Sequence, residues 1–192
     1  MKILITGDSF AADWQVKYPK EKGWPNLVAE DHTVTNLAQA GCSEYKIYQQ
    51  LNSVNLNDFD KILISHTSPY RVYIKHHPVH SNDPLHSNSD LIYTDLKEHA
   101  KTDKSLASII DYFEKYFDLD HAIFVHNLIC RQIDEMSNNY DVTHLSNLDW
   151  SGLYQFPNML NFEYLFKNRR GLMNHYDQLG NLEIYNKLKS VL

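Results

Sequence analysis

Residues 2–10, KILITGDSF, are the stretch that decides the fold. The apolar run at residues 3–5 predicts a short buried strand, which we place at Lys2–Thr6. Gly-Asp-Ser follows at once, and all three residue types favour turns. A serine on a turn after a buried strand can also act as a nucleophile, because nearby backbone N–H groups can stabilise an oxyanion. The stretch therefore predicts either a plain turn or a nucleophile at Ser9.

The whole chain has the composition of a globular protein. It has 192 residues, 43% of them hydrophobic and 12% aromatic, which predicts one domain spanning 1–192. The formal charge of −6 argues against a nucleic-acid partner. We find no run of about 18 apolar residues and no signal peptide, so we expect no membrane partner and a cytoplasmic location, with release by lysis or assembly into a particle left open. Cys42 and Cys130 stand in apolar contexts and predict buried thiols.

Apolar runs alternate with helical patterns along the chain. Further strands are predicted at 32–37, 60–65 and 121–126, and helices at 24–30, 105–117 and 178–192. Another helix is predicted after Ser43, with a buried face of Tyr45, Ile47, Tyr48 and Leu51. This alternation favours an α/β fold with a mainly parallel sheet. Two segments break the rhythm, and we interpret 69–93 and 137–171 as irregular insertions near the active edge.

Polar residues follow several of the predicted strands. Because sites in parallel sheets lie at the carboxyl ends of the strands, we expect 6–9, Gly41, 65–68 and 126–127 to gather at one edge. Gly41 lets a backbone N–H approach a ligand closely. His175 stands just before the last predicted helix, from which we expect it to reach Ser9 as general base and then general acid.

These blocks together resemble the SGNH (GDSL-like) hydrolase family. Residues 7–10 (GDSF) look like its first block, 36–41 like its second, and His175 with Gly180 like its last. The resemblance implies a flavodoxin-like, three-layer α/β/α fold and ester hydrolysis through an acyl-serine. It also implies that Ser9 and Gly41 donate backbone N–H groups to the oxyanion.

Two departures from the family pattern concern the oxyanion hole and the catalytic acid. Where the family has an oxyanion-hole asparagine, this chain reads 65–68, SHTS. Either the Thr67 hydroxyl donates instead, or Arg71 replaces it, or the hole has two donors only. The acid three residues before the histidine is Leu172 here, so His175 works in a dyad or takes an acid from elsewhere, Asp177 being too local. Asp141-x-x-His144 is a rival with the family's acid spacing, but no terminal helix follows it, and we favour His175.

Several other polar residues are candidates for substrate contact. Asp8, Ser68 and Arg71 are expected at the edge, and His77 or His80 folds back over Ser9 if 69–93 forms a lid. The histidines of that segment match no zinc spacing, so we expect a solvated loop, no metal and no cofactor.

The resemblance favours a serine esterase that removes a small acyl group, acetyl first, from a carbohydrate. One alternative is a carbohydrate-binding or structural module that keeps the fold and has weakened turnover, which Thr67 and Leu172 favour. Another is an acyltransferase that uses the same serine with a sugar hydroxyl as acceptor. The expected partner is a small-molecule or glycan ester, and the sequence does not predict an oligomeric state.

Overall fold

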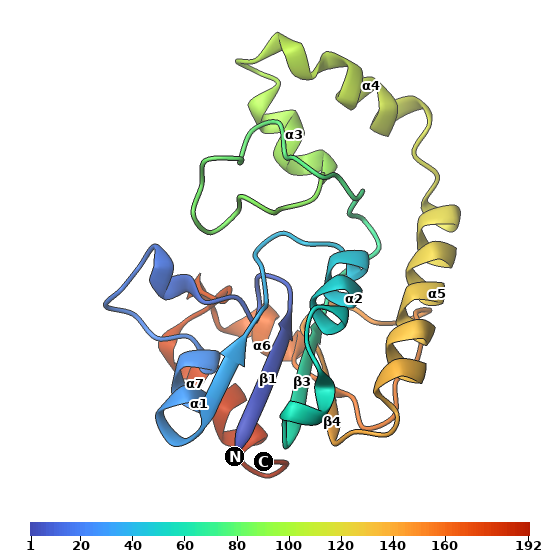
Figure 1. Ribbon diagram of the computed structural model, residues 1–192. Helices are drawn as coiled ribbons and strands as arrows, with labels where there is room; N and C mark the ends of the chain where they lie inside the picture. Colours follow the sequence, from blue (N-terminus) through green and yellow to red (C-terminus); the bar gives the residue numbers. More distant parts are fainter.

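The computed structural model describes residues 1–192 and has a parallel sheet at its centre (Figure 1). Its strands are β1 (Lys2–Gly7), β2 (Thr33–Asn36), β3 (Lys61–His66), β4 (Val142–Ser146) and β5 (Leu160–Asn161). Their order in the sheet is β2-β1-β3-β4-β5, and every pairing is parallel. This is the order of flavodoxin-like doubly wound sheets, so the predicted fold class is confirmed.

Helices cover both faces of the sheet and bury alternate residues of each strand. On one face, α1 (Trp24–Asp31), α6 (Glu163–Asn168) and α7 (Gln178–Leu188) pack with Ile3 and Ile5. On the other, α2 (Glu44–Asn52) and α5 (Leu119–Ser137) pack with Leu4, Ile62 and Ile64. Successive side chains of a strand point to opposite faces, and the apolar run of β1 therefore supports both helical layers.

An arm stands over the carboxyl edge of the sheet (Figure 1). It consists of α3 (Tyr93–His99), a 3-10 turn (Lys104–Leu106) and α4 (Ala107–Lys115). The predicted helix at 105–117 thus exists, but no residue of α4 is buried. The remaining short elements are 3-10 turns at Trp14–Val16 and Leu56–Asp58 and the strand β6 (Arg170–Met173).

The predicted strand at 121–126 is wrong, because these residues lie inside the 19-residue helix α5. The apolar run looks strand-like by itself, but the buried side chains of the helix, His126, Cys130, Ile133 and Ser137, recur every three or four residues. Asp118 caps the helix by accepting the N–H of His121. His126 therefore reaches the sheet edge from a helix and does not follow a strand.

The interpretation of 137–171 as an irregular insertion is also wrong, because this segment holds β4, β5 and α6. By contrast, 69–93 forms no helix or strand before α3 begins, as expected. In α2 the buried face includes Ile47 and Leu51 as predicted, whereas Tyr45 is exposed. Cys42 and Cys130 are free and buried. None of the helices combines the length and the apolar composition needed to cross a bilayer.

Candidate active site

Ser9 sits on a tight turn at the carboxyl end of β1. The chain leaves β1 at Gly7, whose φ of +147° and close approach to β3 exclude a side chain, because a Cβ there would lie 2.6 Å from the Ser65 carbonyl oxygen. Gln50 holds the Gly7 backbone by accepting its N–H (2.8 Å) and donating to its carbonyl (3.1 Å). The carboxylate of Asp8 accepts the Phe10 N–H at 3.0 Å and closes the turn. Ser9 is thereby fixed in position before any substrate binds.

His175 comes to Ser9 from the other end of the chain. Its Nε2 lies 2.7 Å from Ser9 Oγ. Asn174 and His175 both have positive φ (51° and 66°), a conformation that L residues seldom adopt and that aims the imidazole at the serine. The Asn174 side-chain amide holds this turn by donating to the carbonyls of Ala12 (2.8 Å) and Ser9 (3.3 Å). Ser9 and His175 are therefore joined by the hydrogen bonds of Asn174 as well as by their own hydrogen bond.

The rival histidine, His144, lies elsewhere. It belongs to β4, and its Nδ1 is 2.9 Å from His66 Nε2. The geometry therefore favours His175 as the base.

No carboxylate lies within 4 Å of the His175 imidazole. Leu172, in the place of the family's acid, is 45% exposed and lines a different cavity. Asp177 caps α7 by accepting the Gly180 N–H at 2.7 Å. Burial, and then the positive charge of Arg71, lowers the pKa of His175 to about 4. The imidazole is consequently neutral at neutral pH, the form that a general base requires.

Two backbone N–H groups beside Ser9 Oγ are free to bind an anion. Neither the Ser9 N–H nor the Gly41 N–H donates to a protein group. Gly41 has φ of +78°, and a Cβ on it would lie 2.6 Å from Ser89 Cβ, so only glycine fits this turn. These two amides are the donors that the sequence predicts for the oxyanion.

Thr67 belongs to the stretch 65–68, which stands where the SGNH family has its oxyanion-hole asparagine. The Thr67 hydroxyl accepts the Nε–H of Arg71 at 3.2 Å. Arg71 Nη1 donates to the Gly41 carbonyl at 3.1 Å, and both Arg71 and Gly41 line the same cavity as Ser9. Thr67 does not line this cavity whereas Arg71 does, so the guanidinium is the better placed third donor.

Asp8 contributes to the electrostatics of the site from beneath it. The side chain is fully buried, and burial raises the pKa of this carboxyl to about 7, against the opposing effects of the Arg71 charge and the Phe10 N–H. The carboxyl lies behind the nucleophile turn and does not line the cavity.

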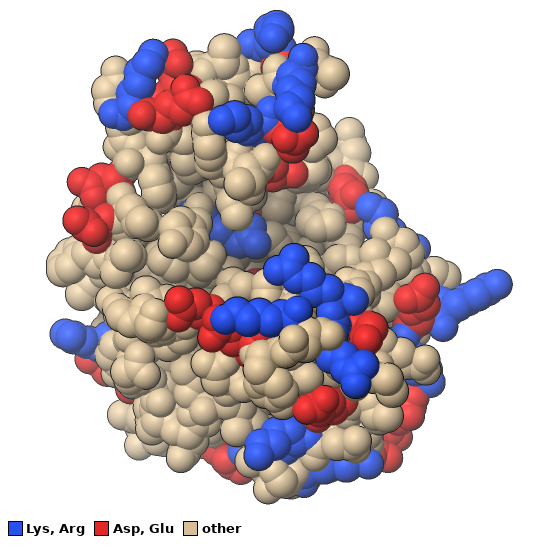
Figure 2. Space-filling model, turned by 180° about the vertical axis from the view of Figure 1, so that it is seen from behind, with Lys and Arg blue, Asp and Glu red and all other residues tan.

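A polar cavity of about 380 Å³ opens in front of Ser9 and His175. The molecule is hollowed between the arm and the body, and acidic and basic side chains are interspersed over the face shown in Figure 2. Ile92 is the one apolar residue of the lining, and the others are Ser9, Lys17, Gly41, Arg71, His80, Asp83, His86, Ser89, Asp90, Asp95 and His175. The segment 69–93 supplies seven of the twelve lining residues, so it borders the cavity in front of Ser9.

The remaining predicted residues are distributed unevenly. His80 lines the cavity, and its Nε2 is 2.9 Å from Asp95 Oδ2. His77 and Ser68 do not line it, and Ser68 faces a second cavity instead. Asp83 and Asp95 were not predicted, because they come from an irregular segment and from the arm, and His86 was noted only as one of the clustered histidines of 69–93.

His77, His80 and Asp95 form one of two groups whose potential ligand atoms lie within 4.8 Å of one another. In this group, His77 Nδ1 accepts the N–H groups of Val79 (3.2 Å) and His80 (3.1 Å). The proton of the neutral ring therefore sits on Nε2, and neither nitrogen offers a free lone pair to a metal.

Comparisons with known proteins find similarity among solved structures. No family model matches the chain, and no curated protein matches it. Among solved structures, a protein from Desulfitobacterium hafniense DCB-2 assigned to the G-D-S-L family of lipolytic proteins is similar along 100% of this chain and 99% of its own, with a TM-score of 0.41 and 14% identity.

Proposed function

We propose that the protein is a serine esterase of the SGNH type, with Ser9 as nucleophile and His175 as general base. The observation that carries this proposal is the 2.7 Å contact between His175 Nε2 and Ser9 Oγ, beside two unoccupied backbone N–H groups. The burial that keeps the imidazole neutral supports it as well.

In the first half of the reaction, Ser9 Oγ attacks the ester carbonyl while His175 Nε2 takes the hydroxyl proton. The oxyanion accepts the N–H groups of Ser9 and Gly41 and the guanidinium of Arg71. When the tetrahedral intermediate collapses, the C–O bond to the alcohol breaks, and His175 returns its proton to the leaving alkoxide. The acyl group remains on Ser9 Oγ.

In the second half, His175 takes a proton from a water molecule, and the hydroxide formed attacks the acyl carbon. Collapse breaks the bond to Oγ, releases the acid and restores the serine with the proton from His175. No carboxylate stabilises the imidazolium in either half, so we expect slower turnover than in an enzyme with a complete triad.

The proposed substrate is a small acyl ester, acetyl first, of a polar alcohol such as a sugar. The lining supports this choice, because carboxylates and imidazoles such as Asp83, Asp95 and His86 suit hydroxyl groups, whereas Ile92 alone offers apolar surface for a long acyl chain.

The deciding experiment is labelling with a fluorophosphonate probe, followed by peptide mass spectrometry. We expect modification at Ser9, with loss of labelling in Ser9→Ala and strong reduction in His175→Ala while both variants keep the wild-type circular dichroism spectrum. A screen of acetylated sugars then measures release of acetate.

A folded wild-type protein that takes up no probe would contradict the proposal. That result would favour a carbohydrate-binding or structural module with this fold, the alternative supported by the missing carboxylate beside His175. Acyl transfer to an added sugar in place of water would instead identify an acyltransferase.

A further inference from the structure

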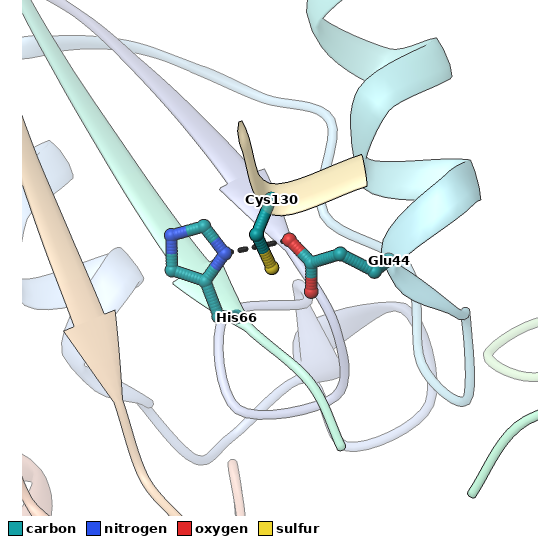
Figure 3. Close-up of side chains that lie close together, drawn as sticks. All are labelled: Glu44, His66 and Cys130. Carbon is teal, nitrogen blue, oxygen red and sulfur yellow. Dashed lines mark hydrogen bonds and ion pairs between the residues drawn. The ribbon is translucent and has the colours of Figure 1, made fainter. Parts of the chain in front are cut away.

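A second cluster of reactive side chains lies inside the molecule, between the sheet and its α2–α5 layer. Glu44 begins α2, His66 ends β3 and Cys130 lies in α5, and Figure 3 shows the three side chains converging on one point. One ligand atom from each lies within 4.8 Å of the other two, and the residues are at most 2% exposed. The Ser9 reaction uses none of them.

The carboxylate of this cluster lacks a permanent cation. No lysine or arginine nitrogen lies within 4 Å of Glu44, whose ion-pair neighbours are the imidazoles of His66 (2.6 Å) and His126 (3.6 Å). A buried carboxylate is costly unless a positive charge or several hydrogen bonds compensate it. A bound cation is one way to provide that compensation.

The surrounding hydrogen bonds orient the ligand atoms. Glu44 Oε2 accepts the Thr67 N–H at 3.2 Å, and Oε1 is hydrogen-bonded to His66 Nδ1 at 2.6 Å, so a metal ion would take the place of the proton between these two atoms. The other nitrogen of this ring, Nε2, lies 2.9 Å from His144 Nδ1. A metal-bound imidazole usually donates its second N–H to such a partner, which fixes the ring.

The His126 ring is also oriented by a hydrogen bond from one of its nitrogens. Its Nε2–H donates to the Thr67 carbonyl at 2.9 Å, so the lone pair of the neutral ring is on Nδ1. This Nδ1 faces Cys130 Sγ at 3.5 Å. A fourth ligand position beside the thiol can therefore be filled by His126 or by water.

Solvent has a route to the cluster. A cavity of about 250 Å³ separates α2, α5 and the segment 68–73, and Glu44 and His126 are part of its wall. Of the three cluster residues, Glu44 alone lines this cavity.

We propose that Glu44, His66 and Cys130 bind a divalent transition metal, Zn²⁺ by preference. Carboxylate, imidazole and thiolate are all zinc ligands, and one carboxylate with one thiolate neutralises the charge of the ion. Binding forms the metal–sulfur bond and releases two protons to solvent, one from the Cys130 thiol and one from the hydrogen bond between Glu44 and His66 Nδ1, while the proton on His66 Nε2 stays in place. Because Glu44 and His126 hold both backbone groups of Thr67, the ion braces the segment that leads to Arg71.

The test uses metal-free full-length protein and Co²⁺ as a spectroscopic substitute for Zn²⁺. We expect one equivalent of Co²⁺ to give a thiolate-to-cobalt charge-transfer band, Zn²⁺ to abolish it, and Zn²⁺ to raise the melting temperature. Cys130→Ser should lose the band, with binding weakened at least about 100-fold. Cys42→Ser is the matched control, because Cys42 is the other buried free thiol and lies outside the cluster, so this variant should keep the band.

Glu44→Gln keeps the thiol and nearly the same volume, and it provides a second variant if Cys130→Ser does not fold. We expect it to weaken Zn²⁺ binding by a similar factor. Absence of the band in the wild-type protein would overturn the proposal, as would a band that survives in Cys130→Ser. Stabilisation by Zn²⁺ without a thiolate band would also overturn it, because that result would place the ion at a site without Cys130.

Discussion

Replacing Arg71 by methionine tests whether a guanidinium has taken the place of the family's oxyanion-hole asparagine. In the proposed mechanism, this change removes one of three donors and leaves the N–H groups of Ser9 and Gly41. Loss of one such donor costs about 3–4 kcal/mol of transition-state stabilisation, so kcat should fall by roughly 10²–10³-fold.

The effect on stability should be much smaller. Arg71 donates two hydrogen bonds within the protein, to Thr67 Oγ1 at 3.2 Å and to the Gly41 carbonyl at 3.1 Å. Each contributes about 1 kcal/mol net, so Arg71→Met should remain folded with a melting temperature lowered by roughly 4–8 °C. Arg71→Met should therefore lower the activity strongly and the stability only slightly.

The same substitution has a second readout in the pH profile. After burial, the Arg71 charge is the largest cause of the low pKa of His175. Its removal should raise that pKa, and the acid limb of kcat/KM should move to higher pH. Arg71→Lys is the control, because it keeps the charge and loses the planar fork. It should lose rate without moving the limb.

The assay is hydrolysis of a 4-nitrophenyl acetate substrate over a pH series, together with thermal unfolding of each variant. If Arg71→Met keeps kcat/KM within about threefold of wild type and the acid limb stays in place, Arg71 is a structural clamp only, and the reasoning is refuted.

Three further predictions concern groups around the nucleophile. The wild-type acid limb should have its midpoint near pH 4, because the neutral form of His175 is the base and its pKa is about 4; a midpoint between about 6 and 7 would show that a carboxylate pairs with the ring in solution. Gly41→Ala should lower the melting temperature by at least about 4 °C and abolish turnover, since φ of +78° and the 2.6 Å approach to Ser89 Cβ both exclude a side chain, and wild-type melting with full turnover would contradict this. Asp8→Asn should match the wild type in stability at low pH and become the more stable protein as pH rises from about 4 to 7, by up to about 4 kcal/mol, because burial raises the folded-state pKa of Asp8 to about 7; urea unfolding at both ends of the range measures this, and a pH-independent difference would contradict it.

The parts of the fold that the sequence predicts are those with a strong local signal. β1 and β3 are apolar runs bounded by turn or polar residues, and their predicted limits agree with the structure to within one residue at each end. β4 reads Val-Thr-His-Leu-Ser, and its polar residues are buried through hydrogen bonds with other elements, which no local pattern reveals. The run 121–126 does have a local apolar signal, but six residues are too few to distinguish a strand from a helix, and the run lies in α5.

The site divides in the same way. Ser9, Gly41 and His175 could be predicted because each stands at a fixed place relative to a strand or helix. Asp95 and the cluster around Glu44 could not, because side chains from distant elements meet there only after tertiary packing. The choice of Arg71 over Thr67 as a donor depends on which of the two side chains lines the cavity, and the sequence does not show this.

The clamp made by Asn174 has a consequence for the order in which the protein is made. The Asn174 side-chain amide binds the carbonyls of Ala12 and Ser9, which precede it in the sequence by 162 and 165 residues. Domains fold as synthesis proceeds, so the nucleophile turn and the first three strands emerge from the ribosome long before their partner. Because α7 covers one face of the sheet, the domain folds as a unit, and the proposed esterase activity should appear only when residues 174–192 are free to dock.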